Sequence, residues 1–287
     1  MKSPSIILLI ILLSGIQLFS APAVASGDLT LSLIQSSNRE FSEPHDIVLS
    51  PDGSLLFVAD NGNDRIVVLD AFTLERRATL GEGLVAAPHD VCFDSDGRLL
   101  VADTGNNRIA VLELKDLSAS LVGEMSERIL SPEGVAVHAD GRVFATGAGS
   151  GNLVVYKDGK VVAEAEGFSA PHDVELDREG RIWVADANHN RMVQLDDKLK
   201  VSRTVSGAPF NLSGPRYMDF DGAGRMFVAD KYSNSIKVVT PEGKLLQVLG
   251  GGNSRLFDRP EGVEILGSDL WFSDTYNNRI VRYRMVP

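Results

Sequence analysis

The sequence repeats itself about every 44 residues, and this period restricts the possible folds more than any other feature. A Pro-His-Asp-(Ile/Val) phrase begins at Pro44, Pro88 and Pro171, and related phrases begin at Pro132, Pro215 and Pro260. The spacings between successive phrases are 44, 44, 39, 44 and 45 residues. Similarity at a fixed period of this length is the mark of a repeat architecture, in which each repeat is one supersecondary unit.

Each repeat has the pattern of four short β-strands. The phrase leads into a turn, then into an apolar strand such as 56–60, then into an Asn-rich turn and a third strand such as 65–69. A fourth strand, such as 244–249, closes the unit. Since no helical periodicity separates the strands, this pattern predicts an all-β propeller of four-stranded blades that stack around an axis. A β-sandwich is the alternative, and the fixed period disfavours it.

The two ends of the chain together make one further blade. The segment from Pro260 to Pro287 has 28 residues, and the segment from Ser26 to Glu43 has 18, which together come close to one period. We therefore predict that residues 29–34 supply the outer strand of the last blade and close the ring. The chain is then a single six-bladed propeller over residues 26–287.

Residues 1–25 have the pattern of a secretory signal peptide. Lys2 gives the positive end, residues 6–13 are an apolar run, and Ala23-Val24-Ala25 offers small residues for cleavage before Ser26. The alternative is a transmembrane anchor, but the run is shorter than the roughly 20 residues needed to span a bilayer. We expect a secreted or periplasmic protein without a membrane span after cleavage.

Charge and cysteine content exclude several functional classes. The chain has 28 Lys and Arg against 39 Asp and Glu, for a net charge of −11, which argues against nucleic acid and anionic membranes as partners. The single cysteine, Cys92, excludes an intramolecular disulfide framework and a Cys-rich zinc site.

An Asp and an Arg recur five residues apart after the second strand. Asp60, Asp103, Asp186 and Asp274 precede Arg65, Arg108, Arg191 and Arg279. We expect each Asp to accept hydrogen bonds from the N–H groups of the turn and to pair with its Arg. The alternative is a ring of surface carboxylates for a ligand. The third blade breaks the pattern with Thr146 and Asn152, and the fifth has Ser235 for Arg.

The combination of Pro-x-(Gly/Asp)-(Val/Ile), Val-Ala-Asp and Asn-x-Arg-Ile resembles NHL repeats, and the similarity covers residues 29–287. That resemblance implies a protein-interaction platform, an RNA-binding domain or an enzyme, and the acidic charge disfavours RNA. Among the enzymes, the Pro-His motifs are similar to those of peptidyl-α-hydroxyglycine α-amidating lyase. This likeness implies six blades, secretion and a zinc ion bound by histidines of the inner strands.

The strand that begins at each Pro should be the innermost, so its polar residues should line the central channel. The second residues of the six phrases are His45, His89, Glu133, His172, Arg216 and Glu261. The third residues are Asp46, Asp90, Gly134, Asp173, Tyr217 and Gly262. We predict that the charged, imidazole and phenol side chains of both sets form a ligand-binding channel.

His45, His89 and His172 are the candidate metal ligands. Three imidazoles and a water make a catalytic zinc site, and the Asp after each His can fix the imidazole tautomer. In the amidating lyase the ligands come from alternating blades, whereas these histidines lie on the first, second and fourth, so the three-fold arrangement is lost. Calcium bound by Glu133 and the Asp set is a further possibility, as in lactonase-type relatives. The alternative is a channel that holds only water.

Two functions from different classes remain. The first is a monomeric scaffold that binds a protein, peptide or small-molecule ligand at the channel or at the loop face. The second is a metal-dependent lyase or hydrolase that uses the channel, for which the resemblance implies Tyr217, Arg216 and Glu133 as catalytic candidates. The fold alone does not choose between them.

Overall fold

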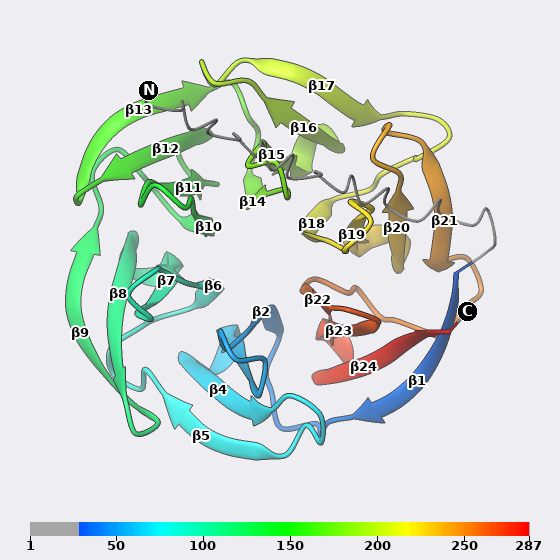
Figure 1. Cartoon of the computed structure of the whole chain (residues 1–287), viewed down its shortest axis with the longest axis horizontal. Coiled ribbons are helices and arrows are strands. Elements are labelled where there is room, and N and C mark those ends of the chain that lie inside the picture. The colour runs from blue at the N-terminus through cyan, green and yellow to red at the C-terminus, as the bar shows by residue number, and fades with distance from the viewer. Residues whose placement is uncertain (1–28, 287) are drawn as a thin grey trace, which may run out of the picture.

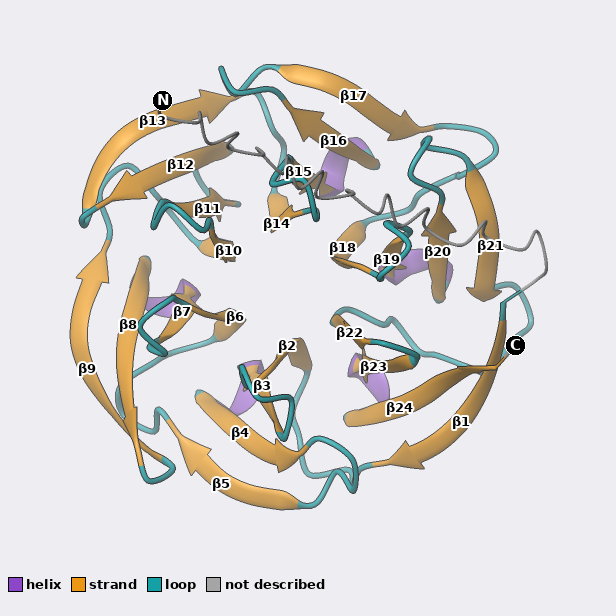
Figure 2. Ribbon diagram, viewed as in Figure 1, coloured by secondary structure: helices purple, strands orange, loops and turns teal. Residues whose placement is uncertain are grey.

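Six four-stranded antiparallel sheets surround a central axis in the computed structural model, which describes residues 29–286 (Figure 1). In each sheet the strand that begins at the Pro phrase lies nearest the axis, and in the first five blades the later strands follow outward in chain order. Figure 2 shows that strands make up almost all of the ring. This confirms the predicted six-bladed all-β propeller. The predicted signal peptide, residues 1–25, lies outside the described residues.

The blades have closely similar strand lengths. Blade 1 contains β2 (Pro44–Leu49), β3 (Leu55–Asp60), β4 (Arg65–Asp70) and β5 (Arg76–Leu80). Blade 2 contains β6 (Pro88–Phe93), β7 (Leu99–Asp103), β8 (Arg108–Lys115) and β9 (Ser118–Met125). Blade 3 contains β10 (Pro132–Val137), β11 (Val143–Gly147), β12 (Asn152–Lys157) and β13 (Lys160–Glu166).

The second half of the ring repeats this plan. Blade 4 contains β14 (Pro171–Leu176), β15 (Ile182–Asp186), β16 (Arg191–Leu195) and β17 (Val201–Ser206). Blade 5 contains β18 (Pro215–Phe220), β19 (Met226–Asp230), β20 (Ser235–Val239) and β21 (Leu245–Gly250). Blade 6 contains β22 (Val263–Leu266), β23 (Asp269–Asp274), β24 (Arg279–Val286) and β1 (Thr30–Ser36). Short 3₁₀ turns follow the second strand in five blades: η1 (Asn61–Asn63), η2 (Thr104–Asn106), η3 (Ala187–His189), η4 (Lys231–Ser233) and η5 (Thr275–Asn277). Among residues 29–286, no helix is long and apolar enough to cross a membrane.

The N-terminal strand closes the ring. β1 pairs antiparallel with β24, so that Thr30 lies opposite Val286 and Leu33 opposite Tyr283. The pairing continues past the strand, because the Ser37 N–H donates to the Ile280 carbonyl at 2.9 Å. The outer strand of blade 6 therefore comes from the other end of the chain, as the residue count predicted, and β24 has no open edge.

Hydrophobic clusters between neighbouring blades form the core. Trp271 of blade 6 is fully buried among residues of blade 1 that include Leu56 and Val67, and its Nε1–H donates to the Ala71 carbonyl at 2.7 Å. Trp183 of blade 4 lies in the equivalent cluster against blade 5. Both tryptophans, at equivalent positions of their second strands, therefore belong to the core between neighbouring blades.

In the blades that have it, the recurring Asp at the end of the second strand bonds to the loop that precedes the inner strand. Asp103 is fully buried, accepts the Ala86 N–H at 2.7 Å and accepts Arg108 Nε–H at 2.7 Å. We had expected the backbone donor to lie in the turn after the Asp. It lies instead in the loop before the inner strand. Because the equivalent carboxylates in the other Asp-bearing blades are also fully buried, they cannot form the surface ring for a ligand that was the alternative.

The Asn-rich turn joins each blade to the next. Asn107 has φ 54°, in the left-handed region that Asn tolerates better than most residues, and its Oδ1 accepts the Ser131 N–H of blade 3 at 2.8 Å. The equivalent bonds join Asp64 to Ala87, Asn190 to Gly214, Asn234 to Arg259, and Asn278 to Glu43. The turn therefore stabilises the interface between blades as well as the strand connection.

The two blades that break the Asp–Arg pattern use other polar groups at the same place. In blade 3, Asn152 Nδ2–H donates to the Arg128 carbonyl and to Glu164, each at 2.7 Å. In blade 5, Lys237 Nζ lies 3.1 Å from Asp230 Oδ2 and supplies the cation that Ser235 lacks. Asn152 and Lys237 therefore supply polar partners at this place, although the buried Thr146 hydroxyl of blade 3 has no hydrogen-bond partner among residues 29–286.

Deletion of residues 30–36 should open the ring. The edge of β24 would lose its partner strand, so we expect aggregation or a large fall in Tm by calorimetry and light scattering. The matched control is Leu33→Thr, which changes an exposed side chain of β1 and keeps the strand. A deletion variant that stays monomeric with an unchanged Tm would contradict the closure.

Replacement of Asp103 by Ala should destabilise the fold by about 2–4 kcal/mol, because it leaves the Ala86 N–H and the Arg108 guanidinium without their buried acceptor. Urea unfolding measures this loss. Asp96→Ala, which removes a carboxylate with 70% side-chain exposure from the same blade, should cost far less. Equal effects of the two changes would show that the buried pair has no special role.

Candidate functional site

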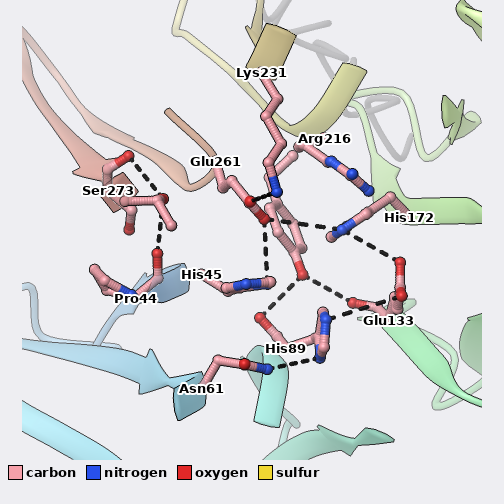
Figure 3. Close-up of polar contacts among 12 residues, drawn as sticks. Pro44, His45, Asn61, His89, Glu133, His172, Arg216, Lys231, Glu261 and Ser273 are labelled. Atoms are coloured by element: carbon pink, nitrogen blue, oxygen red, sulfur yellow. Dashed lines mark hydrogen bonds and ion pairs between the residues drawn. The ribbon is translucent and has the colours of Figure 1, made fainter. Parts of the chain in front are cut away.

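Three histidines converge at the mouth of the channel where the inner strands begin. His45, His89 and His172 project from β2, β6 and β14, and Figure 3 shows them pointing toward one another. One ring nitrogen from each lies within 4.8 Å of the other two. The ring centroids of His45 and His89 are 4.3 Å apart, and those of His89 and His172 are 5.7 Å apart. The three imidazoles therefore lie close together, although the histidines are not evenly spaced around the ring.

All three imidazoles are neutral at neutral pH. Burial is the largest cause, and it lowers the pKa of His89 to about 3. Burial also holds the pKa of His45 and of His172 well below the usual range, and the nearby charges of Lys231 and Arg216 act in the same direction. The neutral form of imidazole is the one that offers a lone pair to a metal.

A hydroxyl and a carbonyl orient His89. Its Nδ1 lies 2.8 Å from Thr104 Oγ1 and 3.1 Å from the Ala87 carbonyl oxygen. The Thr104 hydroxyl also donates to the Pro132 carbonyl at 2.5 Å, and Asn61 Nδ2 lies 3.1 Å from the same His89 Nδ1. On the other side of the ring, His89 Nε2 lies 3.8 Å from Glu133 Oε1.

Two carboxylates and two cations complete the cluster. Glu133 Oε2 lies 3.2 Å from His172 Nε2, and Glu261 Oε2 lies 3.2 Å from His45 Nδ1. Lys231 forms an ion pair with Glu261, which is fully buried (Figure 3). Burial raises the pKa of Glu133 to about 7. We call this group the histidine chamber: His45, His89, Glu133, His172, Arg216, Lys231 and Glu261.

Several buried polar atoms of the histidine chamber lack a hydrogen-bond partner among the described residues. They are His172 Nδ1 and Arg216 Nε, while His45 Nδ1, Glu133 Oε2 and the two carboxylate oxygens of Glu261 have only the charged contacts given above. Such atoms are rare in native interiors, and each calls for an explanation such as a water, an ion or a ligand. The donor set of imidazole nitrogens and carboxylate oxygens suits zinc.

Sequence reasoning missed Lys231, although a signal for it was present. It is the first residue of η4, directly after the recurring Asp. The equivalent residues Thr104 and Thr275 donate to the Pro132 and Pro44 carbonyls of the next blade. The first residue of each 3₁₀ turn therefore faces the channel mouth. Lys231 places a positive charge there, where two of the other turns have a threonine.

Tyr217 divides the channel. Its side chain is 1% exposed, and its hydroxyl lies 3.0 Å from the His89 carbonyl and 3.1 Å from the Glu133 carbonyl, on the far side of the axis. Its ring packs edge-on against His172 with the centroids 4.9 Å apart. Burial raises the pKa of the Tyr217 phenol well above its usual value. This geometry supports a structural role beneath the histidines rather than the role of a base.

A cavity of about 330 Å³, which Tyr217 helps to line, lies on the other side of Tyr217 from the histidines. The sequence led us to expect that Asp46, Asp90 and Asp173 orient the imidazoles. These three residues line this cavity instead. The sequence analysis missed the other carboxylates of this acidic chamber: Glu175, Asp219 and Glu264. Each is the fifth residue of its Pro phrase, so strand alternation places it on the same side as the third residue.

The carboxylates of the acidic chamber also link inner strands, which do not pair with one another. Asp90 accepts the Val135 N–H of the next blade at 2.6 Å, and Asp173 accepts the Met218 N–H at 2.9 Å. Asp219 and Glu264 accept the N–H groups of Ile265 and Leu49 in the same way. Part of the acidity of the channel therefore has a structural cause.

Comparison with known proteins gives independent support for the fold. The NHL repeat family model matches residues 86–112 and 168–195. Among curated proteins, none matches the chain.

The solved structures that match are propellers with low sequence identity. Virginiamycin B lyase from Staphylococcus aureus aligns with a TM-score of 0.64 and 14% identity, covering 90% of this chain and 100% of that one. A streptogramin B lyase has a TM-score of 0.64 and 16% identity, with 90% and 88% covered. An auxiliary nutrient binding protein from Bacteroides ovatus has a TM-score of 0.69 and 15% identity, with 92% and 75% covered. At these identities the likeness establishes the fold alone.

The acidic chamber should make stability fall as pH rises. Burial raises the pKa of Glu175 and of Glu264 from 4.5 to about 8. Between these two pKa values the unfolded chain releases protons that the folded chain keeps. The stabilisation that these two carboxyl groups contribute is therefore fully present below pH 4.5 and is lost as the pH rises to about 8. Each carboxyl should contribute at least about 1 kcal/mol to this loss. In the double variant Glu175→Gln/Glu264→Gln, the free energy of unfolding should fall less over this range.

The control for this comparison is Glu179→Gln, which removes an exposed carboxylate of blade 4. Its pH dependence should match that of the parent protein. Identical slopes in the parent and the double variant, measured by denaturant unfolding, would contradict the assigned protonation of the chamber.

Proposed function

We propose that this six-bladed propeller with NHL repeats is an exported ligand-binding protein whose ligand site is the histidine chamber, with a zinc ion held by His45, His89 and His172. The observation that carries the proposal is the convergence of the three ring nitrogens within 4.8 Å of one another. The pattern of residues 1–25 supports export.

The electrostatics of the histidine chamber support a bound cation. The three imidazoles are neutral, and the Glu261 carboxylate is fully buried. Lys231 forms an ion pair with this carboxylate, whose Oε2 lies 3.2 Å from His45 Nδ1, while Glu133 lies on the other side of the cluster. A divalent cation among these groups would satisfy lone pairs whose burial is otherwise costly.

The chamber also has groups that suit a ligand with a negative charge. Arg216 and Lys231 lie at the channel mouth beside Tyr232, which is 57% exposed, at 5.8 and 5.9 Å from its ring centroid. These side chains can bind a carboxylate and an apolar or aromatic part of a small molecule or peptide. When bound, zinc acts as a Lewis acid that polarises a coordinated oxygen.

A metal-dependent lyase or hydrolase is the second candidate function, and Glu133 favours it. A carboxyl with a pKa of about 7 can take up or release a proton at neutral pH, and Glu133 Oε2 lies 3.2 Å from His172 within the cluster. The structural neighbours include two proteins named as lyases and one named as a nutrient binding protein. Since the same fold serves both classes, the neighbours do not choose between them.

Zinc titration of chelator-treated protein tests the proposal. We expect about one zinc per chain with a dissociation constant in the micromolar range or below, measured by isothermal calorimetry and by elemental analysis. His89→Ala should weaken zinc binding at least about tenfold. The matched control is His189→Ala in the turn of blade 4, where the imidazole is 48% exposed and pairs with Asp186. The control should bind zinc as the parent does.

Circular dichroism and Tm establish that both variants are folded. No zinc uptake by the folded parent protein, or equal affinity in the His89→Ala variant, would overturn the assignment of the metal to the histidine chamber.

A further inference from the structure

The acidic chamber has two chemically different halves. At the fifth position of the Pro phrase, blades 1–3 have Val48, Cys92 and Ala136, whereas blades 4–6 have Glu175, Asp219 and Glu264. Both sets line the same cavity of about 330 Å³. One half of the wall is therefore apolar and the other half carries carboxyl groups, while Asp46, Asp90 and Asp173 lie deeper, toward Tyr217.

The carboxyl groups of this chamber have no cationic partner within its walls. None of the described residues that line it is a Lys, an Arg or a His. Asp46 is only 7% exposed, and its hydrogen-bonding neighbours are the Ile47 N–H of its own strand and the carboxyl of Asp90. Within residues 29–286, no backbone N–H of another blade donates to Asp46, unlike Asp90 and Asp173. Two adjacent buried carboxyls cannot both ionise unless a positive charge joins them.

The shape of the chamber disfavours a bare metal ion. Within residues 29–286, the three histidines are the one group of potential metal ligands whose donor atoms all lie within 4.8 Å of one another. The carboxylates of the acidic chamber do not form such a group, whereas calcium needs six to eight oxygen ligands around one point. The volume is on the order of ten water molecules and suits a small organic ligand.

We propose that the acidic chamber is a second binding site, separate from the histidine chamber, for a small organic ammonium ion with a short hydrocarbon chain. The ammonium group lies among Glu175, Asp219 and Glu264, whose carboxyl groups release protons to solvent on binding and accept hydrogen bonds from it. The hydrocarbon chain packs against Val48, Cys92 and Ala136. Tyr217 separates this ligand from the metal site on the other side of the channel.

Calorimetric titration of the whole protein with n-butylammonium chloride tests the site. We expect one ion bound per chain, with butanol, which has the same chain length without the charge, binding at least about tenfold more weakly. Calcium chloride should not compete. Absence of butylammonium binding up to about 10 mM, equal binding of butanol, or displacement by calcium would each overturn the proposal.

Amide variants locate the site without removing the hydrogen-bond acceptors that link the blades. Glu175→Gln/Glu264→Gln and, separately, Asp219→Asn should each weaken butylammonium binding at least about tenfold and leave zinc binding unchanged. Glu179→Gln, an exposed change on the same blade, should bind butylammonium as the parent does. Parent-like binding in both chamber variants would place the ion elsewhere and refute the assignment. Because zinc binding is read separately, failure here leaves the proposal for the histidine chamber intact.

Discussion

The structure depends on hydrogen bonds that join each blade to the next at and near the axis. The inner strands of different blades do not pair with one another, so backbone ladders alone cannot hold the ring together there. Side chains replace the ladder, as when Asn107 accepts the Ser131 N–H and Asp90 accepts the Val135 N–H. The hydrophobic clusters between blades supply the bulk of the burial, and these bonds fix the register in which blades meet.

The need for side-chain hydrogen bonds between neighbouring blades makes the channel polar. The residues that differ from blade to blade give the channel groups that can bind ligands. Tyr217 crosses the axis to the carbonyls of His89 and Glu133 and separates two chambers of different character. On one side, neutral imidazoles meet the carboxylates of Glu133 and Glu261. On the other side, carboxyl groups face an apolar wall. The two chambers suit different ligands, a metal in the first and an organic cation in the second.

The sequence predicted the fold almost completely, because the repeat period, the strand pattern and the divided last blade are local or countable features. The second position of each Pro phrase also led to the prediction of a polar channel lining, and three of these residues, His45, His89 and His172, lie with their ring nitrogens within 4.8 Å of one another. It did not predict that Asp90 and Asp173 bond to the next blade, because that depends on the angle between blades. Lys231 and Glu175 were not predicted, because they lie outside the second and third positions of the Pro phrase: Lys231 is in the turn after the second strand, and Glu175 is two residues further along the inner strand.

The central claim is that His45, His89 and His172 hold one metal ion, although they come from blades 1, 2 and 4. A crystal structure of zinc-loaded protein, with anomalous data collected at the zinc absorption edge, tests this most directly. We predict one anomalous peak in the histidine chamber, within about 2.1 Å of one ring nitrogen of each histidine. A chamber without a peak in zinc-loaded crystals, or a peak bound by other residues, would contradict the account.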